Sequence, residues 1–444
     1  MKNIVLAMAM LMSITTQAQE KWTLRQCLEY AMQNNITLRQ DKLQELSATE
    51  DRKQSQAALL PSLSASTNHT VGYRPWQDAG IATVSNGTVS TKVRKTYYNG
   101  TYGINTSWTV WNGNKNHNQV KLNKLYEQQA HLNTLQSANT IQEKIAQLYV
   151  QVLYTNDAIA VTRQSLAASK KNEERGEQMV EVGSMSKAEL AQLTAQRATD
   201  EYNLVDAETK LAGYKLQLKQ LLEITGDLPF DVATPTASDE QALQDIPALS
   251  SVYEQALLTR PEIKNAQIDL QARDLQIKIA RSGHMPTISM TGGVGTSTTT
   301  NNSNEWGRQI KTNFDASAGV GVSVPIFDQR KTRTALNKSI IEREKAMLAI
   351  EQQRKTLYQK IETFWLDALT NQQKFRSAQV SVESAQQSYD LLSEQFQLGL
   401  KNIVELMNGK TNLLKAQQNM LQSKYVTILA QQMLQFYQGS EIMM

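Results

Sequence analysis

Residues 313–326 read NFDASAGVGVSVPI, and residues 98–111 read YNGTYGINTSWTVW. Both stretches alternate apolar or aromatic side chains with Gly, Ser, Thr, Asn or Asp, which is the pattern of a β-strand with one apolar face. Weaker versions of this pattern occupy residues 62–73 and 287–297. A sheet with one apolar face and one face of small polar residues fits either a soluble sandwich or a membrane barrel with lipid outside and water inside.

Aromatic residues at the ends of these strands favour the membrane barrel. One end carries Tyr73, Trp76, Tyr97 and Tyr98, and the other end carries Trp108, Trp111 and Phe327. This placement is typical of two aromatic girdles at the membrane surfaces. Four strands are too few to close a barrel, for which about eight is the minimum, so several copies must share their strands. A trimer would form a barrel of about twelve strands, four from each chain.

The chain is internally duplicated. Residues 111–113 align with residues 327–329 at an offset of 216, and this offset pairs Gly183 with Gly399 and Glu189 with Glu405. Upstream of residue 111 the offset becomes 225, so one loop of the first half is nine residues longer. We therefore predict a first repeat over 19–225, a Pro-containing linker over 226–247 and a second repeat over 248–444.

Each repeat has the order helix, strand, loop, strand, very long helix, turn, helix. Apolar residues at alternating spacings of three and four run from Leu357 to Phe396, broken only at Asn371, and from Ile141 to Leu166 in the first half, as in a coiled coil. Helices are predicted over 23–58, 113–180, 186–224, 249–281, 329–396 and 402–437. Each very long helix would be a rod of about 100 Å. Two shorter helices placed end to end could lie beside it.

The N-terminus predicts export. Residues 1–18 read MKNIVLAMAMLMSITTQA, which combines a basic start at Lys2, a short apolar run and small residues before a cleavage site at Ala18. We interpret this segment as a secretory signal peptide, and the alternative is a retained membrane anchor.

Composition argues against several classes of function. The chain has 46 Lys and Arg against 42 Asp and Glu, interspersed along its length, so nucleic acid is not an implied partner. A single cysteine, Cys27, excludes an internal disulfide and a Cys-rich metal site. The four histidines are scattered without zinc-binding spacing. We therefore predict neither an enzyme nor a bound cofactor.

The chain resembles the TolC-like outer-membrane efflux proteins. The resemblance rests on the duplicated order of elements, the helix-to-strand junctions at residues 59–61 (LLP) and 284–286 (HMP), and paired turns at residues 182–184 (VGS) and 398–406 (LGLKNIVEL). It implies a homotrimer with a 12-stranded barrel in the outer membrane and a long α-helical coiled-coil barrel in the periplasm. Such proteins are exit ducts for inner-membrane transporters of the RND or ABC type, joined through a periplasmic adaptor protein.

The resemblance also implies two groups of functional residues. The adaptor-docking tips are Val182, Gly183, Ser184, Leu398, Gly399 and Leu400, and the pore constriction or gate is Glu405, Asn408, Lys401 and Phe396. Two residues depart from the family pattern: Ser184 stands where Leu or Thr is usual, and Asn408 stands where a second acid is usual. The alternative interpretations are plain helix-turn-helix corners for the tips and a solvated charge at a helix start for Glu405.

Two alternatives of function stay open from the sequence. The first is a periplasmic coiled-coil tether or adaptor without a pore. The second lies within the channel class, because efflux and protein secretion use the same kind of duct and the sequence does not distinguish their cargoes.

Overall fold

The computed structural model describes residues 21–76, 80–84, 87–91, 94–226, 230–235 and 237–442, with the backbone alone for 80–84 and 87–91. The predicted signal peptide, residues 1–18, lies outside these residues. The chain divides into two compact units. Unit 1 comprises Met1–Leu43, Leu132–Lys264 and Glu351–Met444, and unit 2 comprises Gln44–His131 and Asn265–Ile350. Each unit draws residues from both predicted repeats.

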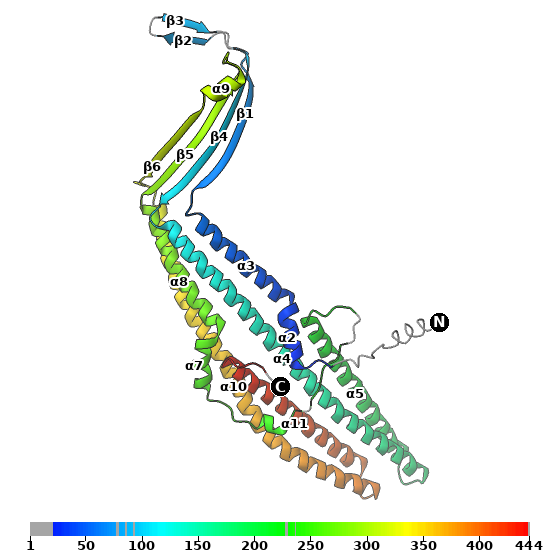
Figure 1. The fold of residues 1–444 in the computed structure, drawn as a ribbon. Coiled ribbons are helices and arrows are strands. Elements are labelled where there is room, and N and C mark those ends of the chain that lie inside the picture. Colours follow the sequence, from blue (N-terminus) through cyan, green and yellow to red (C-terminus); the bar gives the residue numbers. More distant parts are fainter. Residues whose placement is uncertain are drawn as a thin grey trace, which may run out of the picture. The chain divides into compact units, whose positions relative to one another are not determined.

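The main elements follow the predicted order, but the predicted loops between the strands contain two short strands in the first half and a short helix in the second (Figure 1). The first half contains α2 (Leu24–Asn34), α3 (Ile36–Ala57), β1 (Ser62–Tyr73), β2 (Gly80–Val84), β3 (Gly87–Thr91), β4 (Thr96–Trp111), α4 (Lys115–Glu181) and α5 (Lys187–Leu221). The second half contains α6 (Asp239–Ala242), α7 (Leu249–Thr259), α8 (Pro261–Arg281), the 3-10 helix η1 (Ser282–His284), β5 (Thr287–Thr299), α9 (Trp306–Thr312), β6 (Asp315–Ser323), α10 (Lys331–Gln397) and α11 (Ile403–Tyr437).

The helices of the two halves have matching lengths. Helices α4 and α10 each contain 67 residues, and α5 and α11 each contain 35. Their first residues, Lys115 with Lys331 and Lys187 with Ile403, keep the offset found in the sequence.

Two helices that were predicted to be continuous are broken. Between α2 and α3, the Asn35 side chain accepts a hydrogen bond from Leu38 N–H at 3.3 Å and donates one to the Leu221 carbonyl at 3.2 Å. Between α7 and α8, Arg260 is extended because Pro261 disfavours a helical conformation in the residue before it. The predictions over 23–58 and 249–281 were therefore wrong at these two points.

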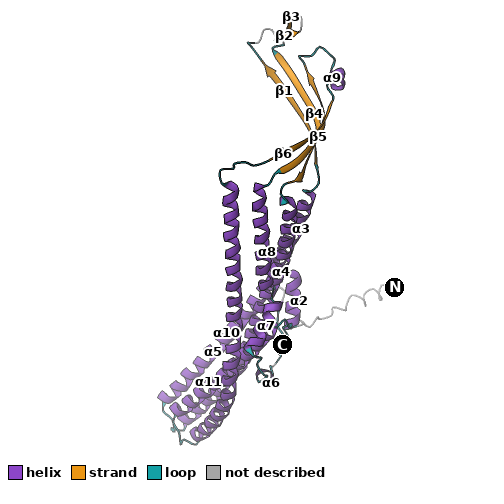
Figure 2. Ribbon diagram, turned by 90° about the vertical axis from the view of Figure 1, so that its left-hand side faces the viewer, coloured by secondary structure: helices purple, strands orange, loops and turns teal. Residues whose placement is uncertain are grey.

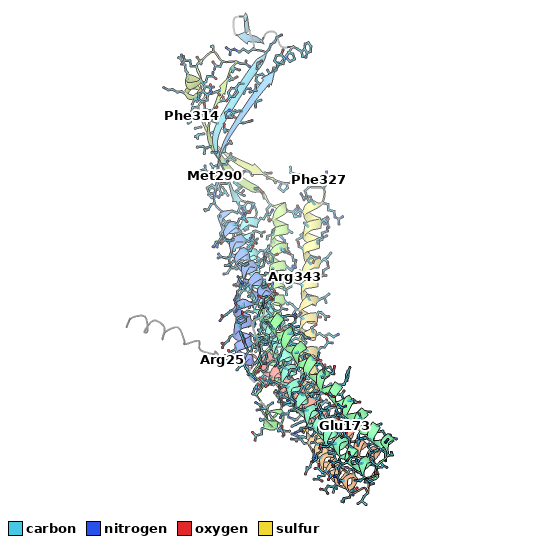
Figure 3. The ribbon with its side chains drawn as sticks, turned by 90° about the vertical axis from the view of Figure 1, so that its right-hand side faces the viewer. Arg25, Glu173, Met290, Phe314, Phe327 and Arg343 are labelled. Atoms are coloured by element: carbon cyan, nitrogen blue, oxygen red, sulfur yellow. The ribbon has the colours of Figure 1, made fainter. Side chains whose placement is uncertain are left out.

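The main sheet lies in unit 2 and is antiparallel, with the strand order β1-β4-β5-β6. Its register pairs Ile104 with Val294, and Met290 with both Trp108 and Val320, so the apolar alternation of all four strands falls on one face. Small polar residues such as Asn105, opposite Gly293, fall on the other face. Figure 3 labels Met290 of β5 and Phe314, the residue just before β6. The apolar face predicted from period-two alternation is confirmed.

The sheet is open at both edges. Strands β1 and β6 are the edge strands, and nearly all of their residues are exposed. Strand β6 ends at Ser323, before the predicted limit at residue 326, and Pro325 follows within the departing segment. A proline has no N–H to donate to a strand ladder, which favours this early end.

The core of unit 1 is built from the apolar stripes of its helices, which Figure 2 draws in purple. Tyr149 of α4 is buried with Cys27 of α2 and Met433 of α11, and its hydroxyl donates to the Ala233 carbonyl at 2.7 Å. A second cluster contains Leu357 and Ile361 of α10. The buried residues of α10 also include Ala368, Phe375, Ala378 and Phe396, which follow the predicted three-and-four spacing.

Segments of the predicted linker are held against the helices of unit 1. The Gln372 side chain of α10 donates hydrogen bonds to the carbonyls of Ala242 and Gln244, at 3.0 and 2.8 Å. None of the described helices is both long enough and apolar enough to cross a membrane. The described residues also contain no cluster of His, Cys, Asp and Glu side chains that could hold a metal ion.

Candidate hairpin tips and pore constriction

The first hairpin tip joins α4 to α5 in unit 1. Gly183 has a φ of +78°, and its N–H donates to the Val180 carbonyl while Ser184 N–H donates to the Met179 carbonyl. This pair of bonds is a Schellman motif, which satisfies the free carbonyls at the end of α4 and needs a left-handed residue. Ser186 then begins α5 with a capping box, in which it exchanges hydrogen bonds with Glu189.

The second tip joins α10 to α11 with the same backbone. Gly399 has a φ of +73°, and the N–H groups of Gly399 and Leu400 donate to the carbonyls of Phe396 and Gln395. Asn402 and Glu405 form the capping box of α11. No atom lies within 4 Å of a Cβ built on Gly183 or Gly399, so the backbone conformation alone explains the glycine at each turn.

The two hairpins pack against each other beside these turns. Phe396, which is 4 % exposed, is buried with Leu193 of α5 and with Ile403 and Leu406 of α11. A Cβ on Gly409 would meet a Leu392 side-chain carbon at 2.6 Å, so this glycine allows α10 and α11 to approach closely. The structure thus places Phe396 in the interior of the tip, where it contributes to packing.

Apolar side chains are exposed at both turns. Val182, Leu398 and Leu400 are 78 %, 74 % and 71 % exposed, and Ser184 is exposed beside Val182. Val404, on the first turn of α11, adds to this surface. Apolar side chains are thus exposed to solvent at the turn of each hairpin.

The acidic residue of the predicted constriction is paired within the chain. Lys401 Nζ lies 2.7 Å from Glu405 Oε1, and Asn402 N–H donates to Glu405 Oε2 at 3.4 Å. The hydrogen bond from Lys401 is the main cause that holds the pKa of Glu405 below its ordinary value. Asn408 is exposed three residues further on, so it lies on the same side of α11 as Glu405.

A buried charge between the hairpins was missed by the sequence reasoning. Lys410 of α11 is 6 % exposed and contacts Asp200 of α5, which is 2 % exposed, and Ser169 of α4. Ser169 also donates to Asp200, and Gln196 Nε2 donates to the other Asp200 oxygen at 3.1 Å. We call these residues the Lys410 cluster.

Burial and pairing shift the pKa of Lys410 in opposite directions. Removal from water lowers the pKa of its ammonium group, and this effect exceeds the opposite effect of the hydrogen bond to Asp200. The sequence did hold a signal for the cluster. Ile403, Leu406 and Leu413 continue the three-and-four spacing, and Lys410 occupies an apolar position within it.

The fold matches solved structures of outer-membrane channels. A crystal structure of CusC, in a study of transmembrane channel formation, aligns with a TM-score of 0.81 and 18 % identity over 94 % of this chain and 92 % of that one. The outer membrane protein VceC of Vibrio cholerae aligns with a TM-score of 0.75 and 17 % identity over 95 % and 97 % of the two chains. At these identities the likeness shows the fold alone.

Sequence comparison gives the family. The model of the family described as outer membrane efflux protein matches residues 27–223 and 252–440, and the chain therefore belongs to this family. It is also similar to the outer membrane efflux protein BepC of Brucella suis, with 24 % identity over 97 % of this chain and 88 % of that protein.

The predicted family, fold class and localisation are confirmed. The chain is mostly helical with one four-stranded antiparallel sheet, and it belongs to a family of outer-membrane channels that have a periplasmic extension. The family consists of transporters rather than enzymes.

Proposed function

We propose that the chain is the outer-membrane exit duct of a tripartite export system. Three copies form the duct, which receives substrates from an inner-membrane RND or ABC transporter through a periplasmic adaptor protein. The cargo, whether small molecules in efflux or proteins in secretion, is then selected by the transporter. The duct itself carries out no chemical reaction and needs no cofactor.

The observation that carries this proposal is the open, one-sided sheet of unit 2. The edge strands β1 and β6 each present unpaired backbone groups, and exposed edges of this kind must be covered or paired. On the apolar face, Leu63, Val71 and Val320 are exposed in the single chain. Pairing between neighbouring copies satisfies the edges, and lipid covers the apolar face. A periplasmic tether without a pore would leave both features unexplained.

The hairpin tips are proposed to bind the adaptor. Val182, Leu398 and Leu400 offer exposed apolar side chains on turns with a fixed backbone, which suits them to pack against another helical hairpin. Gly183 and Gly399 set the shape of the turns, and Ser184 makes the first tip less apolar than the second.

The constriction is proposed to lie at Glu405 and Asn408. In a trimer three copies of Glu405 would surround one axis, and such a ring favours cations. Lys401 offsets part of this charge through its ion pair with Glu405 and restrains the closed state. Phe396 supports the ring from inside the tip through its packing on Ile403 and Leu406.

The test uses the purified mature protein in planar bilayers. We expect trimers in detergent and ion-conducting channels, with Glu405→Gln lowering the ratio of cation to anion permeability and Lys401→Ala raising the conductance. Glu189→Gln is the matched control, because Glu189 has the same capping role in the first repeat. A monomer soluble without detergent would contradict the duct. Equal selectivity in Glu405→Gln and the wild type would remove Glu405 from the constriction.

A further inference from the structure

Helix α9 lies across the apolar face of the sheet. The ring of Trp306 makes an edge-to-face contact with Tyr102, with centroids 6.1 Å apart, and Thr296 Oγ1 donates to the Ile310 carbonyl at 2.7 Å. Tyr102 and Thr296 are paired neighbours in β4 and β5, on the same face as Ile104 and Val294. The helix therefore covers part of the surface that faces lipid in the proposed barrel.

Polar contacts fasten α9 to the end of the sheet. Gln309 is buried, and its side chain accepts a hydrogen bond from Thr299 N–H at 2.8 Å and donates one to the Asn304 carbonyl at 2.7 Å. Asn313 Nδ2 donates to the Ser297 carbonyl at 2.7 Å. These contacts hold the middle and the C-terminal end of α9 on β5, so the helix presents a fixed outward surface.

The outward surface of α9 is basic and aromatic. Arg308 and Lys311 are exposed and three residues apart, so they share one side of the helix. Neither forms an ion pair with another described residue. Trp306, the first residue of α9, stays 55 % exposed despite its contact with Tyr102. The exposed Glu305, just before the helix, is the acidic side chain nearest to this pair in the sequence.

The position of α9 on the sheet determines on which side of the outer membrane the helix lies. The four main strands join the helices α3, α4, α8 and α10 at one end of the sheet, and α9 lies at the other end (Figure 1). Because the helices extend into the periplasm, the α9 end faces the cell exterior. At the same end, the Arg74 guanidinium lies 4.5 Å from the centre of the Tyr97 ring, which adds a second cation beside an aromatic ring.

We propose that α9 binds the phosphate group of an anionic lipid in the outer leaflet, with Arg308 and Lys311 as the anion-binding side chains. The proposal rests on the proposed barrel. An Arg fork and a Lys ammonium together suit a phosphate, and Trp side chains prefer the boundary between headgroups and acyl chains. The apolar surface that continues from Trp306 to Val294 and Phe314 needs acyl chains to cover it, which a free phosphate ion does not supply.

The test measures lipid retention by the trimer of the mature protein in detergent, using native mass spectrometry. The probes are phosphatidylglycerol, zwitterionic phosphatidylcholine and inorganic phosphate. We expect the wild type to retain phosphatidylglycerol preferentially and the double variant Arg308→Gln/Lys311→Gln to bind it about 25-fold more weakly, about five-fold for each charge removed. Arg354→Gln/Lys355→Gln removes the same charge from exposed positions of α10 and should bind as the wild type does.

Other outcomes would overturn the lipid site. The first is equal retention of phosphatidylglycerol by the α9 variant and the wild type. The second is a loss of phosphatidylglycerol binding in the α10 control as large as that in the α9 variant. The third is displacement of phosphatidylglycerol by inorganic phosphate at a similar concentration. The variant Trp306→Ala, which keeps both cations, should weaken the binding of phosphatidylglycerol and of phosphatidylcholine to the same extent. Trimer mass and conductance, read on the same samples, report on the proposed duct separately.

Discussion

The two hairpin tips share one backbone and differ in their side chains. Gly183 and Gly399 both end a helix in a Schellman motif, and Ser186 and Asn402 both begin the next helix with a capping box to a Glu. Only the second tip adds a charge pair, because Lys401 of the second repeat corresponds to Met185 of the first. The shared turn and capping box therefore explain how the chain reverses direction at each tip. The Lys401–Glu405 pair gives the second tip a charged contact through which the two tips can differ in function.

The same contrast is sharper inside the hairpins. At the offset of 216, Lys410 corresponds to Thr194, Asp200 to Ala416 and Ser169 to Ala385. The buried Lys410 cluster thus has no counterpart in the other half of the duplication. It joins the first hairpin, through α4 and α5, to α11 of the second hairpin.

The largest effect is expected from breaking the Lys410 cluster. Asp200→Ala would leave the Lys410 ammonium buried without its carboxylate, and losing one partner of a buried pair costs about 3–5 kcal/mol of stability. Thr194→Ala, at the position that corresponds to Lys410, should change stability by less than about 0.5 kcal/mol because Thr194 is exposed. Thermal unfolding followed by far-UV circular dichroism measures both.

A double variant separates charge burial from simple packing. Asp200→Leu/Lys410→Met removes both charges and keeps apolar volume, so it should recover most of the stability that Asp200→Ala loses. If the double variant were as unstable as Asp200→Ala, the loss would come from disturbed packing and not from an unpaired charge.

A loss of stability of intermediate size is expected from replacing the glycines of the two turns, and it tests whether the turns are equivalent. Gly183→Ala and Gly399→Ala should each cost about 1–2 kcal/mol, because each places a Cβ on a left-handed residue. The two costs should agree, since neither added Cβ meets another atom within 4 Å. Asn, which tolerates this conformation better, should recover part of the loss at both positions. Clearly unequal melting temperatures would show that one turn depends on further contacts.

The sequence predicted the repeating parts of the fold for physical reasons. Period-two alternation placed the strands to within a few residues, and apolar spacing with paired glycines placed the long helices and their turns. The break before Pro261 was visible in the sequence, because a proline restricts the residue before it. The break at Asn35 was not, since it depends on a hydrogen bond to Leu221, which lies far away in the chain.

The candidate site was predictable only in part. The turns were found from Gly183 and Gly399, but the ion pair at Glu405 and the burial of Phe396 follow from packing at the tip. Helix α9 was missed because its short polar sequence becomes helical through contacts such as that of Gln309 with Thr299. Gate and docking roles depend on neighbouring copies and partners, so they stay predictions.

The smallest effect concerns the acids of the two capping boxes. Glu405 and Glu189 both have a pKa below the ordinary value, mainly through the hydrogen bond from Lys401 for Glu405 and the backbone hydrogen bond from Ser186 for Glu189. A carboxyl group whose pKa is lowered by folding contributes stability above its unfolded pKa, and this contribution is lost as the pH falls through the folded pKa. Acidification should therefore weaken both boxes.

Melting temperatures between about pH 6 and about pH 3 separate the two acids. Glu405→Gln and Glu189→Gln should each flatten the decline of the melting temperature with acid. Lys401→Met should reduce the contribution of Glu405 alone, and added salt should mimic this change because the pair is partly exposed. If Lys401→Met left the acid dependence of Glu405 intact at low salt, the capping box alone would account for that carboxylate, and the two tips would be electrostatically equivalent.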